Sequence, residues 1–69
     1  MKYFLLSDAA EILGCMNYQI TYLISTRKVP EPKRFAGRRA FRVQDLVRIA
    51  KIMNVNLDKN LLAEQGRIL

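Results

Sequence analysis

The chain of 69 residues contains no histidine, no tryptophan and a single cysteine. One thiol cannot close an intramolecular disulfide, and a chain without histidine lacks the ligands of most multi-ligand metal sites. The commonest general base is absent too, no two carboxylates stand paired on one expected element, and no glycine-rich phosphate loop occurs. We therefore expect a protein that is not an enzyme and that holds no metal and no cofactor.

Long apolar runs are also missing. No run approaches the ~18 residues that a membrane-spanning helix needs. Residues 1–6 resemble the start of a signal peptide, but Ser7, Asp8 and Glu11 interrupt the segment before an apolar region forms. With 51% hydrophobic residues and one unpaired cysteine, the composition fits one small folded domain in a reducing cytoplasm, with no membrane partner.

Positive charge, in contrast, is concentrated in one place. Residues 27–42 contain seven of the twelve Lys and Arg residues and only one acid, Glu31, so this segment carries a net charge of +6 (7 − 1). The other residues hold five bases and five acids and sum to zero. Charge gathered in this way is typical of a protein that binds a polyanion.

The first part of the chain predicts two short helices joined by a tight turn. Ser7 is a suitable N-cap for a helix over residues 8–13, and Gly14 is suited to the left-handed position that ends it. Residues 14–16 form the turn. Asn17 then precedes a second helix over residues 18–26, and two helices joined by a short turn with glycine are typical of a helix-turn-helix.

The periodicity of the second helix separates a buried from an exposed side. Ile20, Leu23 and Ile24 recur at the spacing of one helix face and predict the buried side. Tyr18 and Tyr22 fall on the opposite side, and Gln19 and Thr21 flank it. The tyrosines are therefore expected to be exposed, although the alternative that they are core aromatics stays open.

Residues 30–42 predict a β-hairpin. Pro30 and Pro32 exclude a helix, and residues 33–35 and 40–42 alternate polar with apolar side chains around a turn over residues 36–39, where Gly37 supplies a positive φ. Phe35 and Phe41 are expected to point inward and to pack on the helices. The arginines of this segment are expected to point outward.

A third helix is predicted over residues 43–53, with Leu46, Ile49, Ala50 and Met53 on its buried face. Residues 54–56 break it. Asn56 is a candidate N-cap for a last short helix over residues 57–65, with Leu61 and Leu62 as its contacts. We expect a DNA-binding domain over residues 1–55 and a C-terminal short helix or tail over residues 56–69.

Taken in order, these parts resemble the MerR-like winged helix-turn-helix superfamily, especially its small excisionase-like members. The resemblance lies in residues 5–14 for the first helix and turn, residues 17–24 for the second helix, and residues 27–30 for the basic segment that ends in proline. Residues 37–42 match the wing, and residues 45–46 match the start of the third helix.

The resemblance implies a mainly α fold with a small two-stranded β wing, with the second helix in the major groove and the wing on the backbone or in the minor groove. The sequence departs from the family pattern at three positions. Thr21 stands where arginine is frequent, Lys28 where glycine is usual, and Arg42 where a Ser or Thr cap is common. The long dimerising helix and effector domain of full regulators are missing, so no small-molecule effector is expected.

The candidate DNA-binding residues are Asn17, Tyr18, Gln19, Thr21, Tyr22, Arg27, Lys28, Lys33, Arg34, Arg38 and Arg39. For some of them a structural role competes. Asn17 is a candidate helix cap as well as a base contact. Arg27 and Lys28 are equally suited to bonding the last carbonyls of the second helix and to contacting phosphate. Cys15 is expected to fill the core, and Met16 to lie in the core or at its rim.

The sequence therefore predicts sequence-specific binding of duplex DNA by a small transcription regulator or an excisionase-like factor in DNA recombination. We expect it in the cytoplasm, associated with the nucleoid, in a bacterium or phage, with further copies side by side on the DNA. The alternative is a helix-turn-helix that binds a protein, as in a phage packaging or scaffold component. An RNA-binding module is disfavoured because no stacking platform of sheet aromatics is apparent.

Overall fold

The computed structural model describes residues 2–68. It is mainly helical, with two small antiparallel sheets of two strands each. The elements in chain order are β1 (Lys2–Tyr3), α1 (Leu6–Leu13), α2 (Asn17–Ser25), β2 (Arg34–Phe35), β3 (Arg38–Arg39), α3 (Val43–Met53), α4 (Lys59–Glu64) and β4 (Arg67–Ile68). The general part of the predicted fold class, a mainly α chain with a small two-stranded sheet, is confirmed.

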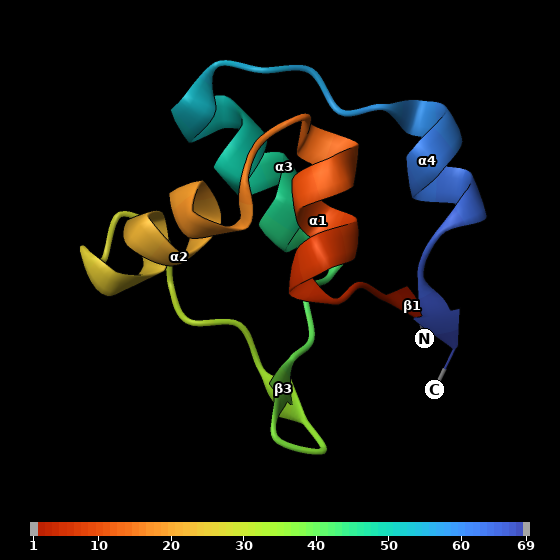
Figure 1. The fold of residues 1–69 in the computed structure, drawn as a ribbon, viewed down its shortest axis with the longest axis horizontal. Helices are drawn as coiled ribbons and strands as arrows, with labels where there is room; N and C mark the ends of the chain where they lie inside the picture. Colours follow the sequence, from red (N-terminus) through yellow and green to blue (C-terminus); the bar gives the residue numbers. More distant parts are fainter. Residues whose placement is uncertain (1, 69) are drawn as a thin grey trace.

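Helix α1 lies at the centre of the molecule. It contacts α2, α3 and α4, while the hairpin of β2 and β3 projects from one end (Figure 1). The buried face predicted for α2 is confirmed, because Ile20, Leu23 and Ile24 are buried. On α3 the predicted Leu46, Ile49 and Ala50 are buried, whereas Met53 is only half-buried at the edge of the core. The core is completed by Phe4, Ala9, Ala10, Ile12, Leu13, Val29, Phe41 and Ala50.

The three longer helices begin in the same way. The backbone N–H of the residue before each helix donates to the side chain of the third helical residue: Leu5 to Asp8 Oδ2 at 3.1 Å, Met16 to Gln19 Oε1 at 2.8 Å, and Arg42 to Asp45 Oδ2 at 2.9 Å. This is the reverse half of a capping box. The predictions of Ser7 and Asn17 as N-caps are therefore wrong. Helix α1 begins before Ser7, and Asn17 is the first residue of α2.

The same helices also end alike, each with a left-handed residue. Gly14 (φ 66°) follows α1 as predicted, Arg27 (φ 61°) follows α2, and Asn54 (φ 56°) follows α3. After α2, the N–H of Arg27 donates to Ile24 O at 3.0 Å and the N–H of Lys28 donates to Leu23 O at 2.9 Å. These two bonds form a Schellman motif. The resemblance had placed the position usually held by glycine at Lys28. The residue with the left-handed backbone is instead Arg27, one position earlier.

The hairpin is shorter and more tightly turned than predicted. Its register pairs Arg34 with Arg39 and Phe35 with Arg38, so only Ala36 and Gly37 form the turn, and both have positive φ (52° and 79°). Two positive φ values are what a type I′ turn requires, and this turn matches the twist of the strands. Arg38 and Arg39 therefore belong to β3, where the sequence had placed them in the turn.

Only one of the two hairpin phenylalanines is buried. Phe41 is 1% exposed and exchanges backbone hydrogen bonds with Phe4, so the prediction for it is confirmed. Phe35 is 51% exposed, so its predicted inward position is wrong. The cause is the register, because Phe35 precedes the turn at the outer end of the hairpin, beyond the reach of the helices. Its ring instead packs against Tyr3 of β1.

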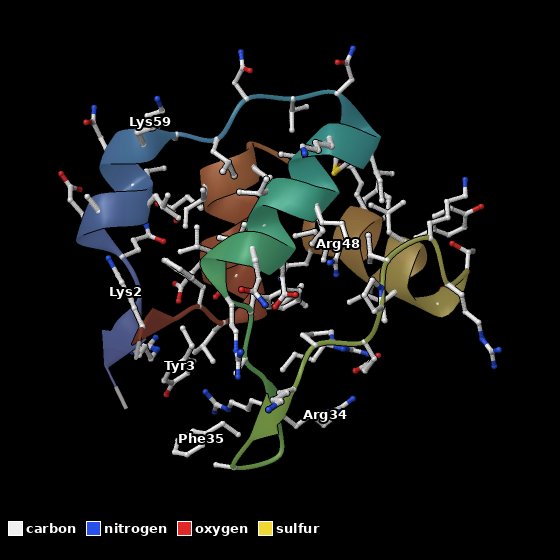
Figure 2. All side chains as sticks on the ribbon, turned by 180° about the vertical axis from the view of Figure 1, so that it is seen from behind. Lys2, Tyr3, Arg34, Phe35, Arg48 and Lys59 are labelled. Atoms are coloured by element: carbon white, nitrogen blue, oxygen red, sulfur yellow. The ribbon has the colours of Figure 1, made fainter. Side chains whose placement is uncertain are left out.

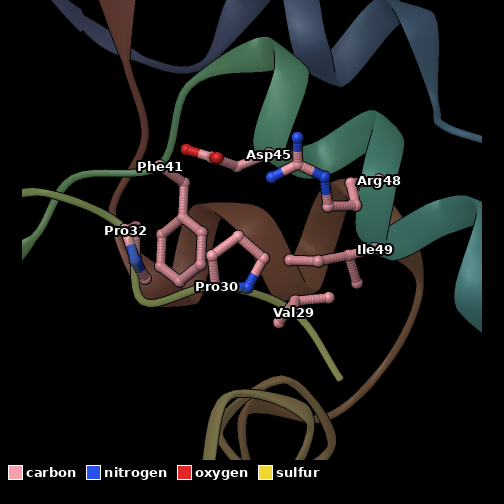
Figure 3. A pocket seen from close by; sticks show the side chains of 7 residues that line it. All are labelled: Val29, Pro30, Pro32, Phe41, Asp45, Arg48 and Ile49. Atoms are coloured by element: carbon pink, nitrogen blue, oxygen red, sulfur yellow. The ribbon is translucent and has the colours of Figure 1, made fainter. Parts of the chain in front are cut away.

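The extended segment before the hairpin is anchored on α3. Val29, Pro30 and Pro32 pack around the ring of Phe41 and beside Ile49, and Asp45 and Arg48 of α3 lie at the rim (Figure 3). The space left between them is about 10 Å³. That is no more than one water molecule needs, so the base of the hairpin is closely packed.

The C-terminal residues fold against α1. Helix α4 is shorter than the predicted 57–65 and is capped by Asp58, whose Oδ1 accepts from the N–H groups of Asn60 and Leu61, so the prediction of Asn56 as the cap is wrong. Leu61 and Leu62 pack against the core as predicted. The strand β4 then pairs with β1, which the sequence did not predict, so the two ends of the described chain lie side by side.

Two further predictions concern the turn between α1 and α2. Cys15 is half-buried and packs against the core, and this burial raises the pKa of its thiol. Met16 is 61% exposed, so it does not fill the core. Within residues 2–68, none of the helices has the length and apolar character that crossing a membrane demands.

Candidate nucleic-acid interface

The hairpin presents its basic side chains on both faces. Arg34 and Arg39 are cross-strand partners and therefore share one face, while Arg38 is paired with Phe35. Figure 2 shows Arg34 and Phe35 pointing in opposite directions from the hairpin. Alternation along a strand explains this arrangement, because successive side chains leave on opposite faces.

These arginines meet the start of α2 at an open groove. The groove, called here the arginine groove, is lined by Leu5, Leu6, Ser7, Asn17, Arg34, Arg38 and Arg39. Asn17 is the first residue of α2, and its side chain is exposed and takes no part in capping. The first turns of two helices and the arginines of the hairpin thus border one depression. It combines a hydroxyl, an amide and guanidinium groups, which are donors suited to phosphate oxygens.

The three arginines of the hairpin differ in their hydrogen-bond partners. Arg39 Nε donates to Glu31 Oε1 at 2.8 Å, and one terminal nitrogen of Arg34 lies 3.4 Å from the same oxygen. The other terminal nitrogen of Arg34 donates to Gly37 O at 3.1 Å. Arg38 is exposed and, within the described residues, its side chain makes no hydrogen bond and no ion pair.

The exposed side of α2 forms a second, apolar surface. Tyr18 and Tyr22 are 68% and 58% exposed, as the helical periodicity predicted. They line a groove with Gln19, Leu23 and Met53, called here the tyrosine groove, between α2 and the C-terminal end of α3. The candidate residues of α2 are therefore divided, because Asn17 borders the arginine groove and the tyrosines border this one.

Two candidate residues of α2 are occupied within the helix. Gln19 Oε1 accepts the hydrogen bond from the Met16 N–H, so its amide oxygen caps the helix. The Thr21 hydroxyl donates to Tyr18 O at 3.1 Å, and Thr21 is only half exposed. A bidentate contact of Gln19 with adenine would require its amide oxygen to exchange this bond. The amide N–H groups of Gln19 and the lone pairs of the Thr21 hydroxyl keep their capacity for other partners.

The basic residues after α2 are exposed. Arg27 and Lys28 end the helix through their backbone N–H groups, and within residues 2–68 neither side chain donates to a helix carbonyl. Lys33 lies at the base of the hairpin, where its carbonyl accepts from the Ala40 N–H at 2.7 Å. All three side chains are free to extend into solvent and add to the positive potential of this side.

Sequence reasoning missed two residues of this surface. Ser7 was assigned to capping, but it is exposed and lines the arginine groove. Its place at the start of the first helix of the pair was the available signal, because that helix crosses the phosphate backbone in helix-turn-helix proteins. Glu31 was counted only as a charge, and no sequence spacing indicates its contact with Arg39, eight residues further along.

In comparisons with known proteins, no family model, no curated protein and no solved structure matches this chain.

Proposed function

We propose that the protein binds duplex DNA as a winged helix-turn-helix domain of the MerR-like, excisionase-like kind. Helices α1 and α2 are its helix-turn-helix, α2 enters the major groove, and the β2–β3 hairpin is the wing that follows the backbone or the minor groove. One observation carries the proposal. Asn17 at the start of α2 and the three hairpin arginines line the same groove.

The distribution of charge supports a phosphate partner. Residues 27–42 carry a net charge of +6 and the remainder of the chain sums to zero. The guanidinium fork pairs with phosphate oxygens in a bidentate manner, and it also fits a narrow minor groove. Binding that depends on such contacts releases counterions and weakens as salt rises.

The size of the chain bears on its role. A single module of this size contacts few base pairs, so sequence specificity at useful levels requires neighbouring copies. We therefore propose a small transcription regulator or an excisionase-like architectural factor that binds repeated sites side by side. Tyr22 supplies a hydroxyl for phosphate and a ring for a thymine methyl group, and Gln19 supplies an amide for adenine.

The proposal is tested by titrating labelled duplex DNA at salt concentrations from 50 to 200 mM. For four to six neutralised phosphates, log K falls against log salt with a slope of roughly −4 to −5. Arg38→Ala/Arg39→Ala should make the slope shallower by about two. Lys51→Ala/Lys59→Ala is the matched control, since both lysines line a different surface, between α3 and α4, and Lys59 lies at the opposite end of the molecule from Arg34 (Figure 2). Equal slopes for the two double variants would contradict the proposal.

A second candidate function follows from the tyrosine groove. Tyr18, Tyr22, Leu23 and Met53 present apolar surface that is open to solvent. Exposed apolar surface of this kind is found at protein-binding sites. A protein-interaction module would bind DNA weakly even at 50 mM salt, and Tyr22→Ala would abolish capture of its partner while Arg38→Ala/Arg39→Ala would not.

A further inference from the structure

Glu31 stands out because it is the single acid in the basic segment of residues 27–42. On a surface that attracts a polyanion, an acid lowers the attraction. Its carboxylate nevertheless reaches two arginines of the hairpin through one oxygen, Oε1, at 2.8 Å from Arg39 Nε and 3.4 Å from a terminal nitrogen of Arg34.

Stability gives no sufficient reason for this contact. The side chain of Glu31 is 47% exposed, and that of Arg34 is 54% exposed. Ion pairs between groups so open to water contribute little to folding, because water and salt screen them. The main consequence of the contact is instead the orientation that it gives to the side chains of Arg34 and Arg39.

The contact fixes Arg39 while leaving its outer donors free. Glu31 occupies Nε, so the two terminal nitrogens of the guanidinium keep their donors for another acceptor. Arg39 is also the more enclosed of the pair, with its side chain 27% exposed. Arg34 is held twice, by Glu31 and by the carbonyl of Gly37. Because the two arginines face each other across the strands, one carboxylate orients both beside the arginine groove.

We propose that Glu31 is a positioning residue that orients Arg39, and more loosely Arg34, for phosphate contact in the arginine groove. This role rests on the DNA-binding function proposed above. A long arginine side chain loses rotamer freedom when it binds, and an arginine that is already oriented loses less. Arg38, which lacks such a partner among the described residues, is the adaptable member of the group.

Charge and positioning predict different results for two variants of Glu31. Glu31→Gln and Glu31→Ala both remove one negative charge, but glutamine keeps an oxygen that accepts from Arg39 Nε. If Glu31 acts only as a charge, both variants bind DNA more tightly than the wild type and equally well. If Glu31 positions Arg39, Glu31→Ala binds at least about fivefold more weakly than Glu31→Gln, with the same salt slope for both.

The experiment measures duplex DNA affinity for both variants at several salt concentrations. Glu64→Gln and Glu64→Ala are the matched pair at the end of α4, where Glu64 is exposed. They should differ from each other by less than twofold. Melting temperatures of the two Glu31 variants should agree within about 4 °C, as expected for an exposed ion pair in a domain of this size. A difference of less than twofold between Glu31→Gln and Glu31→Ala would overturn the role of Glu31.

A measurement without DNA separates the failure of this role from failure of the proposed function. The Nε–Hε signal of Arg39, assigned by its loss in Arg39→Lys, should exchange slowly with water in the wild type and in Glu31→Gln, and rapidly in Glu31→Ala. Rapid exchange in the wild type would overturn the positioning role even if DNA binds. Slow exchange with no DNA binding by any variant at 50 mM salt would instead overturn the proposed function, and the phosphate role of Glu31 with it.

Discussion

The ring of Tyr3 lies against the ring of Phe35, with centroids 5.6 Å apart and planes inclined by 58°. Tyr3 belongs to β1 and Phe35 to β2, so this contact joins the N-terminal strand to the outer end of the hairpin. A tilted aromatic pair at this spacing is favourable beyond the area that it buries. The contact supports a hairpin that two paired residues on each strand would not stabilise alone.

A double-mutant cycle with Tyr3→Ala and Phe35→Ala should reveal this coupling. We expect an interaction of about 0.5–1 kcal/mol in the free energy of unfolding, measured with urea. The value lies at the lower end of the range for aromatic pairs because Phe35 is 51% exposed. Tyr3→Ala with Tyr22→Ala is the control, and these two effects should add. A coupling below about 0.3 kcal/mol for Tyr3 and Phe35 would mean that the hairpin does not depend on this pair.

Arg27 should be replaceable by glycine with a gain in stability. Its φ of 61° lies in the left-handed region, which costs about 1 kcal/mol for a residue with a Cβ. Arg27→Gly should therefore raise the free energy of unfolding by about 1 kcal/mol, as measured by thermal or urea unfolding. Arg27→Ala is the matched control, because it removes the same charge and keeps the Cβ. Equal stability of the two variants would show that the backbone there is not strained.

Gln19 should contribute to stability, whether or not it also contributes to DNA sequence preference. Its side chain accepts from the Met16 N–H at 2.8 Å, so Gln19→Ala should cost about 1 kcal/mol of unfolding free energy. Gln19→Glu keeps the acceptor and should retain the stability of the wild type. Comparison of the two variants in a DNA sequence-preference assay separates the roles. If both lose the same preference while only Gln19→Ala is destabilised, Gln19 also contacts a base.

Gly37 and Gly66, which both have positive φ, should respond differently to alanine. At Gly66 (φ 110°) an added Cβ would lie 2.9 Å from Phe4 Cε1, and Phe4 is completely buried. At Gly37 (φ 79°) an added Cβ would meet nothing within 4 Å. Gly66→Ala should therefore cost about 2–3 kcal/mol, and Gly37→Ala about 1 kcal/mol from the backbone alone. Equal costs in urea unfolding would mean that β4 moves away from Phe4 at little cost.

Local features of the fold were predictable from the sequence. The buried side of α2, the bounds of α3 and the positive φ of Gly14 and Gly37 depend on residues that are close together in the chain. The starts of α1 and α2 were not predicted correctly, because the acceptor was assigned to Ser7 and Asn17, each placed before its helix. In the structure it is the third helical residue, Asp8 in α1 and Gln19 in α2.

For the candidate interface, the exposure of Tyr18 and Tyr22 was predictable, because one helical repeat decides which side chains share a face. The arginines of the hairpin were predicted as DNA contacts from their residue type and charge alone. Their arrangement was not predictable. The pairing of Arg34 with Arg39 depends on a register that a turn of two residues sets, and the sequence had suggested a turn of four.

The sequence by itself determined the helices, their buried faces and the concentration of positive charge, because periodicity and composition are properties of the chain alone. Only the tertiary structure decided that Phe35 packs on Tyr3, that β4 pairs with β1, and that Asn17 borders a groove with the hairpin arginines. Each of these relationships joins segments that are separate along the chain. The free energy that favours them comes from packing and pairing across the fold, which no local pattern of residues specifies.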